Sequence, residues 1–321
     1  MKIGFLLIVL FILSACASST KQADALLASP GSLSPTHEIQ NVPFINQAAG
    51  QCGPASLAMA INSTGKLINV EELTPQVYTP KMKGSLQSDM ISAARRNGFL
   101  AIPIEGLDSL LKEVSANHPV IVFENLALSW LPQWHYAVVF GYDLKQETIL
   151  MHSGPEAFKI WDIRKFERSW KLGNYWGLVV LPPDQLAATA NELSHATAAA
   201  GLQLVGKQKE AVTAYSEILK RWPQSLVSLI GMGNWAFERR DYKKAVSFLK
   251  TATRYHPQSA EAWHNLAIAE QAAKMNQSAY KSAQRALMLV AHDSKLQYEA
   301  SLSSIKLSHN KQVLLDGIHV I

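Results

Sequence analysis

Residues 46–55 read Asn-Gln-Ala-Ala-Gly-Gln-Cys-Gly-Pro-Ala, and they place a cysteine where a helix is about to begin. We expect that helix to begin at Gly53-Pro54 and to run from Ala55 to Ile61, and Pro54 fits its first turn because the first helical amides have no acceptors. The free amides and the positive end of the helix dipole favour a thiolate at Cys52. Gln47 lies five residues upstream, so the turn can bring its amide beside the thiol. There it would donate to a developing oxyanion together with the Cys52 backbone N–H.

A histidine starts the next informative stretch. His135 begins a β-forming run that extends to Asp143, and residues 143–147 form a polar turn before a second strand returns from Thr148. In such a hairpin the numbers of paired residues sum to about 290, so the group that orients the imidazole should come from residues 153–156. Asp143 is excluded, because eight residues along a strand span roughly 26 Å. A hydrogen-bonded strand histidine without catalytic function is the alternative reading.

This half of the chain resembles the bacteriocin-processing, double-glycine-type cysteine peptidases of the papain clan over about residues 40–181. The resemblance rests on four stretches, which are 42–47 (Val-Pro-Phe-Ile-Asn-Gln), 51–59 (Gln-Cys-Gly-Pro-Ala-Ser-Leu-Ala-Met), 135–142 (His-Tyr-Ala-Val-Val-Phe-Gly-Tyr) and 166–170 (Phe-Glu-Arg-Ser-Trp). It implies an α+β papain-like cysteine peptidase domain. In that domain Cys52 would be the nucleophile, His135 the base and Gln47 the oxyanion donor.

The third catalytic position departs from the family pattern. The family has Asp-Pro on the returning strand, whereas residues 152–155 read His-Ser-Gly-Pro. The resemblance therefore implies Ser153 as the third member, and a neutral serine is a weaker orienting group than a carboxylate. If the predicted register is wrong, Glu156 takes this role instead.

The chain changes character after Leu181. Residues 36–183 contain short β-rich runs punctuated by Gly, Pro and Asp, with helices expected at residues 53–61 and about 85–97. A helix-first segment followed by antiparallel strands predicts an α+β domain. The Pro182-Pro183 pair then marks the domain boundary.

Residues 190–307 are instead rich in alanine and helical in pattern. A period of 34 relates Ala211, Ala245 and Ala279, and the same offset relates Pro223 to Pro257. This is the tetratricopeptide (TPR) period, with small residues where two helices of a hairpin touch. We therefore expect an all-α TPR solenoid of three repeats, capped by residues 293–307, rather than an irregular alanine-rich bundle. Residues 308–321 carry no interpretable pattern.

The N-terminus is typical of an export signal. Residues 1–15 combine a charged start with an apolar run too short to span a bilayer. Leu-Ser-Ala-Cys at 13–16 resembles a bacterial lipobox, which implies cleavage before Cys16 and its acylation by chains such as palmitate. Ala17 then favours the outer membrane, facing the periplasm, and residues 16–35 are expected to be a flexible tether. An ordinary signal peptide with a chance cysteine is the alternative.

Composition excludes several classes of protein. A hydrophobic content of 48% and a charged content of 17% argue against a disordered chain. The net charge of +5 comes from residues 182–321 without dense Lys/Arg clusters, so nucleic acid is not an expected partner. Two cysteines and no Cys-x-x-Cys pair predict no disulfide scaffold, no metal site and no cofactor. A lone Cys52 in an oxidising compartment is a liability unless it is buried or used.

Together these features predict a membrane-anchored cysteine peptidase-like lipoprotein. It would hydrolyse a peptide or protein substrate through Cys52 and His135, recruit a protein partner through the TPR groove and bind the membrane through Cys16. One alternative is a non-catalytic peptide-binding scaffold. A peptidoglycan endopeptidase is the third reading, in which Ser or Asp, rather than Gln51, would precede the nucleophile. The tryptophans at 130 and 134 are expected in an aromatic core rather than in a substrate cleft.

Overall fold

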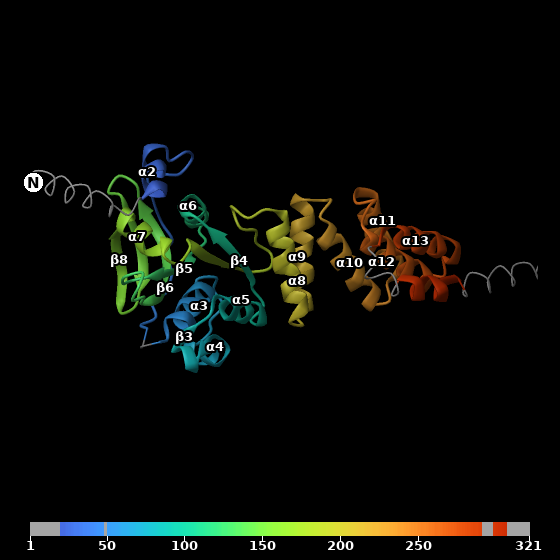
Figure 1. Ribbon diagram of the computed structural model, residues 1–321, viewed down its shortest axis with the longest axis horizontal. Helices are drawn as coiled ribbons and strands as arrows, with labels where there is room; N and C mark the ends of the chain where they lie inside the picture. Colours follow the sequence, from blue (N-terminus) through green and yellow to red (C-terminus); the bar gives the residue numbers. More distant parts are fainter. Residues whose placement is uncertain (1–19, 48–49, 291–297, 307–321) are drawn as a thin grey trace, which may run out of the picture. The chain divides into compact units, whose positions relative to one another are not determined.

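The structure is a computed structural model that describes residues 20–47, 50–290 and 298–306 (Figure 1). The chain forms two compact units, one made mainly of residues up to Leu181 and one made mainly of the helices after Ala190. In these described ranges no helix is long and apolar enough to cross a membrane. The expected signal peptide and Cys16 lie outside the described residues.

A seven-stranded sheet organises the first unit. Six strands follow one another in the order β4 (Leu100–Glu105), β9 (Trp176–Leu181), β5 (Val120–Asn125), β6 (Trp134–Asp143), β7 (Thr148–Ser153) and β8 (Glu156–Asp162), while β1 (Thr36–Glu38) pairs with β6. The middle of β6 is buried at every position, on both faces of the sheet. That burial explains why its sequence is a nearly continuous apolar run instead of an alternating one.

The β6–β7 hairpin has the register expected from the sequence. Ala137 pairs with Ser153 and Val138 with His152, so the paired numbers sum to 290. A bulge further along the strands shifts the pairing by one residue. The predicted register is confirmed, and it brings Ser153 to the neighbourhood of His135.

After its N-terminal helix, the first unit contains further helices and a small ribbon, and Figure 1 labels these helices. They are α3 (Cys52–Asn62), α4 (Val70–Val77), α5 (Gln87–Arg96), α6 (Leu107–Ser115) and α7 (Ile163–Lys171), with the two-stranded ribbon of β2 (Tyr78–Thr79) and β3 (Gly84–Ser85) joined through the 3-10 turn η2 (Pro80–Met82). Helix α3 contacts β5, β6 and β9, and its residues 53–61 are all buried. It begins at Cys52, one residue before the start at Gly53 that the sequence predicts.

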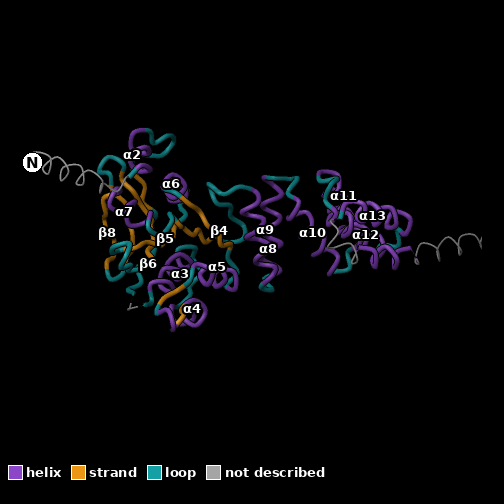
Figure 2. The backbone as a smooth tube through the Cα atoms, viewed as in Figure 1, coloured by secondary structure: helices purple, strands orange, loops and turns teal. Residues whose placement is uncertain are grey.

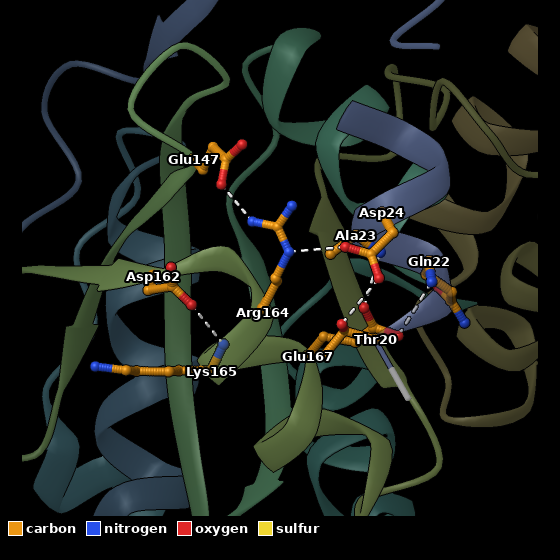
Figure 3. Close-up of polar contacts among 9 residues, drawn as sticks. All are labelled: Thr20, Gln22, Ala23, Asp24, Glu147, Asp162, Arg164, Lys165 and Glu167. Carbon is orange, nitrogen blue, oxygen red and sulfur yellow. Dashed lines mark hydrogen bonds and ion pairs between the residues drawn. The ribbon is translucent and has the colours of Figure 1, made fainter. Parts of the chain in front are cut away.

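Residues 20–35, expected to belong to a flexible tether, instead dock on the first unit (Figure 3). Helix α2 (Lys21–Ala28) contacts α6 and α7. The backbone N–H groups of Gln22 and Ala23 donate to the buried Glu167 carboxylate at 3.2 and 2.8 Å. A carboxylate at the start of a helix satisfies amides that have no intrahelical acceptor. The tether prediction is wrong here because the partner lies 144 residues away in the sequence.

Two further contacts hold α2 in place. The Arg164 Nε atom donates to Asp24 Oδ1 at 2.7 Å, and its Nη1 atom donates to Glu147 (Figure 3). The Gln22 side-chain oxygen accepts the Leu107 N–H at 2.6 Å, which satisfies the first amide of α6. The segment that follows the expected anchor is thus hydrogen-bonded to both α6 and α7.

The second unit consists of paired helices without strands in its described part (Figure 2). The helices are α8 (Glu192–Leu204), α9 (Gln208–Arg221), α10 (Leu226–Glu238), α11 (Tyr242–Tyr255), α12 (Ala260–Ala272) and α13 (Asn276–Leu289). Ala211, Ala245 and Ala279 are fully buried at equivalent places in the second helix of each pair. A side chain at Gly233 would lie 2.7 Å from Leu249 Cγ, so only glycine permits this helix contact. The period of 34 therefore does build a TPR-like helical region.

A further helical stretch at residues 298–306 follows the three pairs. Its Ile305 is 2% exposed and packs with Ala267, Ala279 and Ala283 of the last pair. This apolar cover lies within the segment predicted to cap the repeats. Residues 291–297 and 307–321 lie outside the described part.

Between β9 and α8 the chain passes over the first unit again. The buried Glu113 of α6 accepts the Ala188 N–H at 3.1 Å, the Thr189 N–H at 2.7 Å and the Thr189 hydroxyl at 2.6 Å. Its Oε2 atom also lies 2.7 Å from His118 Nδ1. Burial raises the pKa of this carboxyl, but these hydrogen bonds outweigh burial and hold the pKa below its usual value.

Candidate active site

Cys52 is the first residue of α3 and is half-buried. Burial raises the pKa of its thiol above the usual value, while backbone hydrogen bonds from Tyr136, Gly53 and Cys52 itself act in the opposite direction. The amides expected at the helix start are therefore present, but desolvation outweighs them. The resting group is a thiol, which corrects the expectation of a thiolate. Backbone amides around the sulfur remain in place to stabilise negative charge there once the proton leaves.

Gln47 presents a free donor at the same place. Its side-chain oxygen accepts the Gly154 N–H at 3.2 Å, and this contact fixes which end of the amide is the oxygen. The Nε2 atom is therefore a buried donor, and it has no hydrogen-bond partner. Gly50 has a φ of +78°, and a side chain there would lie 3.2 Å from the Tyr78 ring. Gln47 and Cys52 line the same cavity.

His135 contacts the residue that the hairpin register selected. Its Nε2 atom lies 3.1 Å from the Ser153 hydroxyl, and Ser153 is 3% exposed. This bond leaves Nδ1 as the ring nitrogen available to a thiol. Burial, together with the smaller effect of the nearby Lys159 charge, lowers the pKa of His135 to about 4. At neutral pH the imidazole is therefore uncharged and can accept a proton.

Glu156, the alternative third member, does not contact the imidazole. It is exposed, and its carboxylate pairs with Lys159 Nζ at 3.2 Å. Gly154 has a φ of +62° and forms the tight turn between β7 and β8 with Pro155. Ser153 is therefore the residue of the predicted window that lies at the imidazole.

Gln47, Cys52 and His135 line one cavity of about 670 Å³. The rest of its wall comes from the ribbon of β2 and β3 with η2 and from the ends of β5 and β6, namely Met82, Lys83, Gly84, Ser85, Leu86, Phe123, Gln133, Trp134 and Tyr136, together with Gly50 and Gly154. The Tyr136 hydroxyl donates to the Ser85 carbonyl at 3.2 Å and ties β6 to the ribbon. The Cys52 thiol, the His135 imidazole and the Gln47 amide thus line one cavity.

The sequence reasoning misplaced two aromatic residues and missed two others. Trp134 is 48% exposed, stacks on Phe123 with ring centres 5.0 Å apart and lines the cavity, whereas core packing was expected. Trp130 is 77% exposed, so it is not a core residue either. Tyr136, whose amide bonds to the Cys52 sulfur, was not singled out, although it directly follows His135. Glu124, the Cα partner of His135 on β5, was also missed, because it belongs to no sequence motif.

Comparison with protein families identifies the first unit. Residues 39–177 match the model of the Peptidase_C39 like family. These residues form a C39-like domain. The match covers the expected papain-like region and includes Gln47, Cys52, His135 and Ser153. No curated protein sequence is significantly similar to the chain.

Solved structures resemble each part of the molecule. A C39-like peptidase from Bacillus anthracis is 18% identical over 46% of this chain and 98% of that chain, with a TM-score of 0.40. The peptidase domain of ComA from Streptococcus, an ABC transporter involved in quorum sensing, is 20% identical over 44% and 99%, with a TM-score of 0.37. MamA from Desulfovibrio magneticus, a match to the helical part, is 20% identical over 39% and 71%, with a TM-score of 0.34. The C39-like assignment of residues 39–177 rests on the family match, and the TPR-like character of the later helices rests on their pairing with a period of 34 residues.

Proposed function

We propose that the protein is a lipid-anchored cysteine peptidase of the cell envelope. The observation that carries this proposal is the cavity in which Cys52, His135 and the unpaired amide of Gln47 lie together. The C39-like family match supports the same chemistry. The substrate class is a peptide or a peptide segment of a protein, which the open cavity beside Trp134 can receive.

In the proposed reaction the neutral His135 takes the thiol proton as Cys52 Sγ attacks the peptide carbonyl carbon. The carbonyl oxygen becomes an oxyanion that accepts from Gln47 Nε2 and from the Cys52 backbone N–H. His135 then returns the proton to the leaving amine, and the acyl group stays on sulfur as a thioester. Water attacks the thioester with His135 as base, which releases the acid and restores the thiol.

The raised pKa of the Cys52 thiol and the lowered pKa of the His135 imidazole set the protonation states from which the attack begins. Both shifts have burial as their first cause, and both favour the neutral forms. The proposed peptidase therefore starts from a thiol and an imidazole, and charge develops only during attack. When the substrate carbonyl becomes an oxyanion, its negative charge lies beside the Gln47 side-chain amide and the Cys52 backbone N–H.

The direct test is mass spectrometry of the protein after treatment with a peptidyl electrophile. We expect an adduct on Cys52, none in Cys52→Ala, and a labelling rate lower by about 10²–10⁴-fold in His135→Ala. Hydrolysis of a peptide pool should follow the same order. Wild-type labelling at the rate of free cysteine, with no effect of His135→Ala and no hydrolysis, would contradict the proposal.

That outcome would favour a non-catalytic peptide-binding scaffold. One observation supports this second candidate, since Ser153 and Gly154 stand where the family pattern has an aspartate before proline. The scaffold should bind peptides in the same cavity with equal affinity in the wild type and in Cys52→Ala. Isothermal titration with non-hydrolysed peptides separates the two functions.

The anchor and the partner belong to the same proposal. Lipidation of Cys16 would hold the protein at the outer membrane facing the periplasm, and the helical pairs would recruit a protein partner through their groove. Detergent partitioning tests the anchor, because wild type should enter the detergent phase and Cys16→Ala should not. Equal partitioning of both proteins would remove the lipoprotein assignment.

A further inference from the structure

Glu124 lies directly across the sheet from His135. The two residues are Cα partners in the antiparallel pair of β5 and β6. Side chains of directly opposed residues point to the same face, with Cβ atoms about 4.5–5.5 Å apart. Ser153 shares this face, because it pairs with Ala137, two residues after His135. Glu124 and Ser153 therefore lie on the same face of the sheet as His135, on the two strands that flank it.

Only one oxygen of the Glu124 carboxyl group has a hydrogen-bond partner. Its Oε2 atom accepts the Ser169 hydroxyl of α7 at 2.9 Å. Glu124 is 0% exposed, and its Oε1 atom is buried without a hydrogen-bond partner. A buried carboxyl oxygen without a partner is costly, so a structural role alone does not account for it.

The charges around Glu124 are few. On β8, Lys159 acts on both Glu124 and His135. The Ser169 hydroxyl comes from α7, and the Cys52 thiol of α3 lies in the cavity that His135 lines. The β9 sequence Trp-Gly-Leu-Val-Val-Leu has no titratable side chain. Burial raises the pKa of Glu124 to about 7, against the opposing effects of Ser169 and Lys159.

We propose that Glu124 is the positioning residue that supplies the negative charge for the His135 imidazolium, the charge that Ser153 does not provide. This inference rests on the peptidase function proposed above. No bond to Glu124 forms or breaks. The thiol proton moves from Cys52 to His135 and back to the leaving amine, while Glu124 exchanges its own proton with water as the pH changes.

The sign of the pH dependence follows from this arrangement. Below about pH 7 Glu124 is neutral and does not stabilise an imidazolium. Above about pH 7 it is ionised, and its charge favours protonation of His135 during attack. The rate of peptide hydrolysis should therefore rise through this pH window, for a reason independent of the His135 titration near pH 4.

Glu124→Gln tests the charge while keeping the shape, because the amide oxygen still accepts the Ser169 hydroxyl. Hydrolysis of a peptide pool by the full-length protein is measured from pH 5.5 to pH 8.5. The ratio of wild-type to variant kcat/KM should grow by about tenfold across this range. Ser169→Ala removes a bond that lowers the Glu124 pKa, so it should move the midpoint of the wild-type rise to higher pH. A constant ratio in Glu124→Gln would overturn the proposal.

A second readout does not need activity. In ¹⁵N-histidine-labelled protein, the His135 ring resonances should shift near pH 7 as Glu124 ionises, and Glu124→Gln should remove that step alone. Absence of the step in wild type overturns the proposal. A step without hydrolysis by any of these proteins supports the coupling of Glu124 to His135 and contradicts the proposed peptidase function instead.

Discussion

Among the described residues, the helices from Glu192 to Leu289 leave no buried side-chain polar atom without a partner, whereas residues 39–177 leave five unpaired, namely Gln47 Nε2, Ser56 Oγ, Ser85 Oγ, Arg95 Nε and Glu124 Oε1. Glu270 of α12 shows the contrast. It is 2% exposed, yet one oxygen accepts the Ser282 hydroxyl at 2.7 Å and the other lies 3.8 Å from Lys250 Nζ. The repeats therefore use their buried polar groups to hold helices together.

The C39-like domain contains both kinds of buried polar group. Glu113 has four hydrogen bonds and a lowered pKa, while Glu124 has one hydrogen bond and a pKa of about 7. The difference is location, because Glu113 fastens a connecting segment and Glu124 lies across from His135. Unpaired polar groups cost stability. Two of the residues that carry them, Gln47 and Ser85, line the cavity, and Glu124 pairs with His135 across the sheet.

The largest effect should come from breaking the packing of the repeats. Leu249 is 1% exposed and packs against Gly233, so Leu249→Ala leaves a cavity that costs about 2–5 kcal/mol. Hydrogen exchange read by mass spectrometry should show faster exchange in α10 to α12. Ser247→Ala, at an exposed position on the same helix, is the matched control.

The C39-like domain should not respond to that change. Peptides from α3 and β6 should exchange as in wild type, and Cys52 should react with the electrophile at the wild-type rate. Faster exchange in β6 of Leu249→Ala would show that the stabilities of the two units are coupled. Their buried polar groups could then not be compared as those of separate units.

The next effect should come from removing the unpaired donor of the site. Gln47→Glu keeps the oxygen that accepts the Gly154 N–H and removes the Nε2 donor. Loss of one oxyanion donor lowers kcat by about 10²–10³-fold. Thermal unfolding and kcat should be measured on the same preparation. Unchanged kcat would show that Gln47 contributes only to the fold.

Sequence reasoning succeeded where the decisive contacts are local. The period of 34 predicts the helix pairs because each helix packs mainly on its neighbours in the chain. The hairpin of β6 and β7 predicts the contact of His135 with Ser153, because a short turn fixes the register.

The remaining features depend on contacts between distant segments. The first amides of helix α2 donate to Glu167, far along the chain, and no local sequence pattern predicts that contact. Residues 126–133 connect β5 to β6 and have no simple turn signal. The register that pairs Glu124 with His135 was therefore not predictable. The raised pKa of Cys52 depends on burial by the whole site, whereas the helix start could be read from residues 52–55 alone.

The smallest effect should come from Ser153, which contributes a neutral hydrogen bond worth about 0.5–1.5 kcal/mol. Ser153→Ala should therefore lower the hydrolysis rate by about tenfold or less. Ser153→Asp would place a negative charge beside the imidazole and raise the His135 pKa from its value of about 4. Activity is lost as pH falls through the His135 pKa, because the base becomes protonated. The acid limb of kcat/KM should thus move to higher pH in Ser153→Asp, while turnover at neutral pH is kept or improved.

The exposed Glu156→Ala is the matched control and should behave as wild type from pH 5 to pH 9. If Glu156→Ala abolished hydrolysis while Ser153→Ala did not, Glu156 would be the third member despite its pairing with Lys159. If Ser153→Ala alone abolished hydrolysis, the serine would contribute far more than a neutral bond, and little would remain for Glu124 to do. A modest effect of Ser153→Ala together with a pH-dependent effect of Glu124→Gln divides the orienting role between the hydroxyl on one neighbouring strand and the carboxyl on the other.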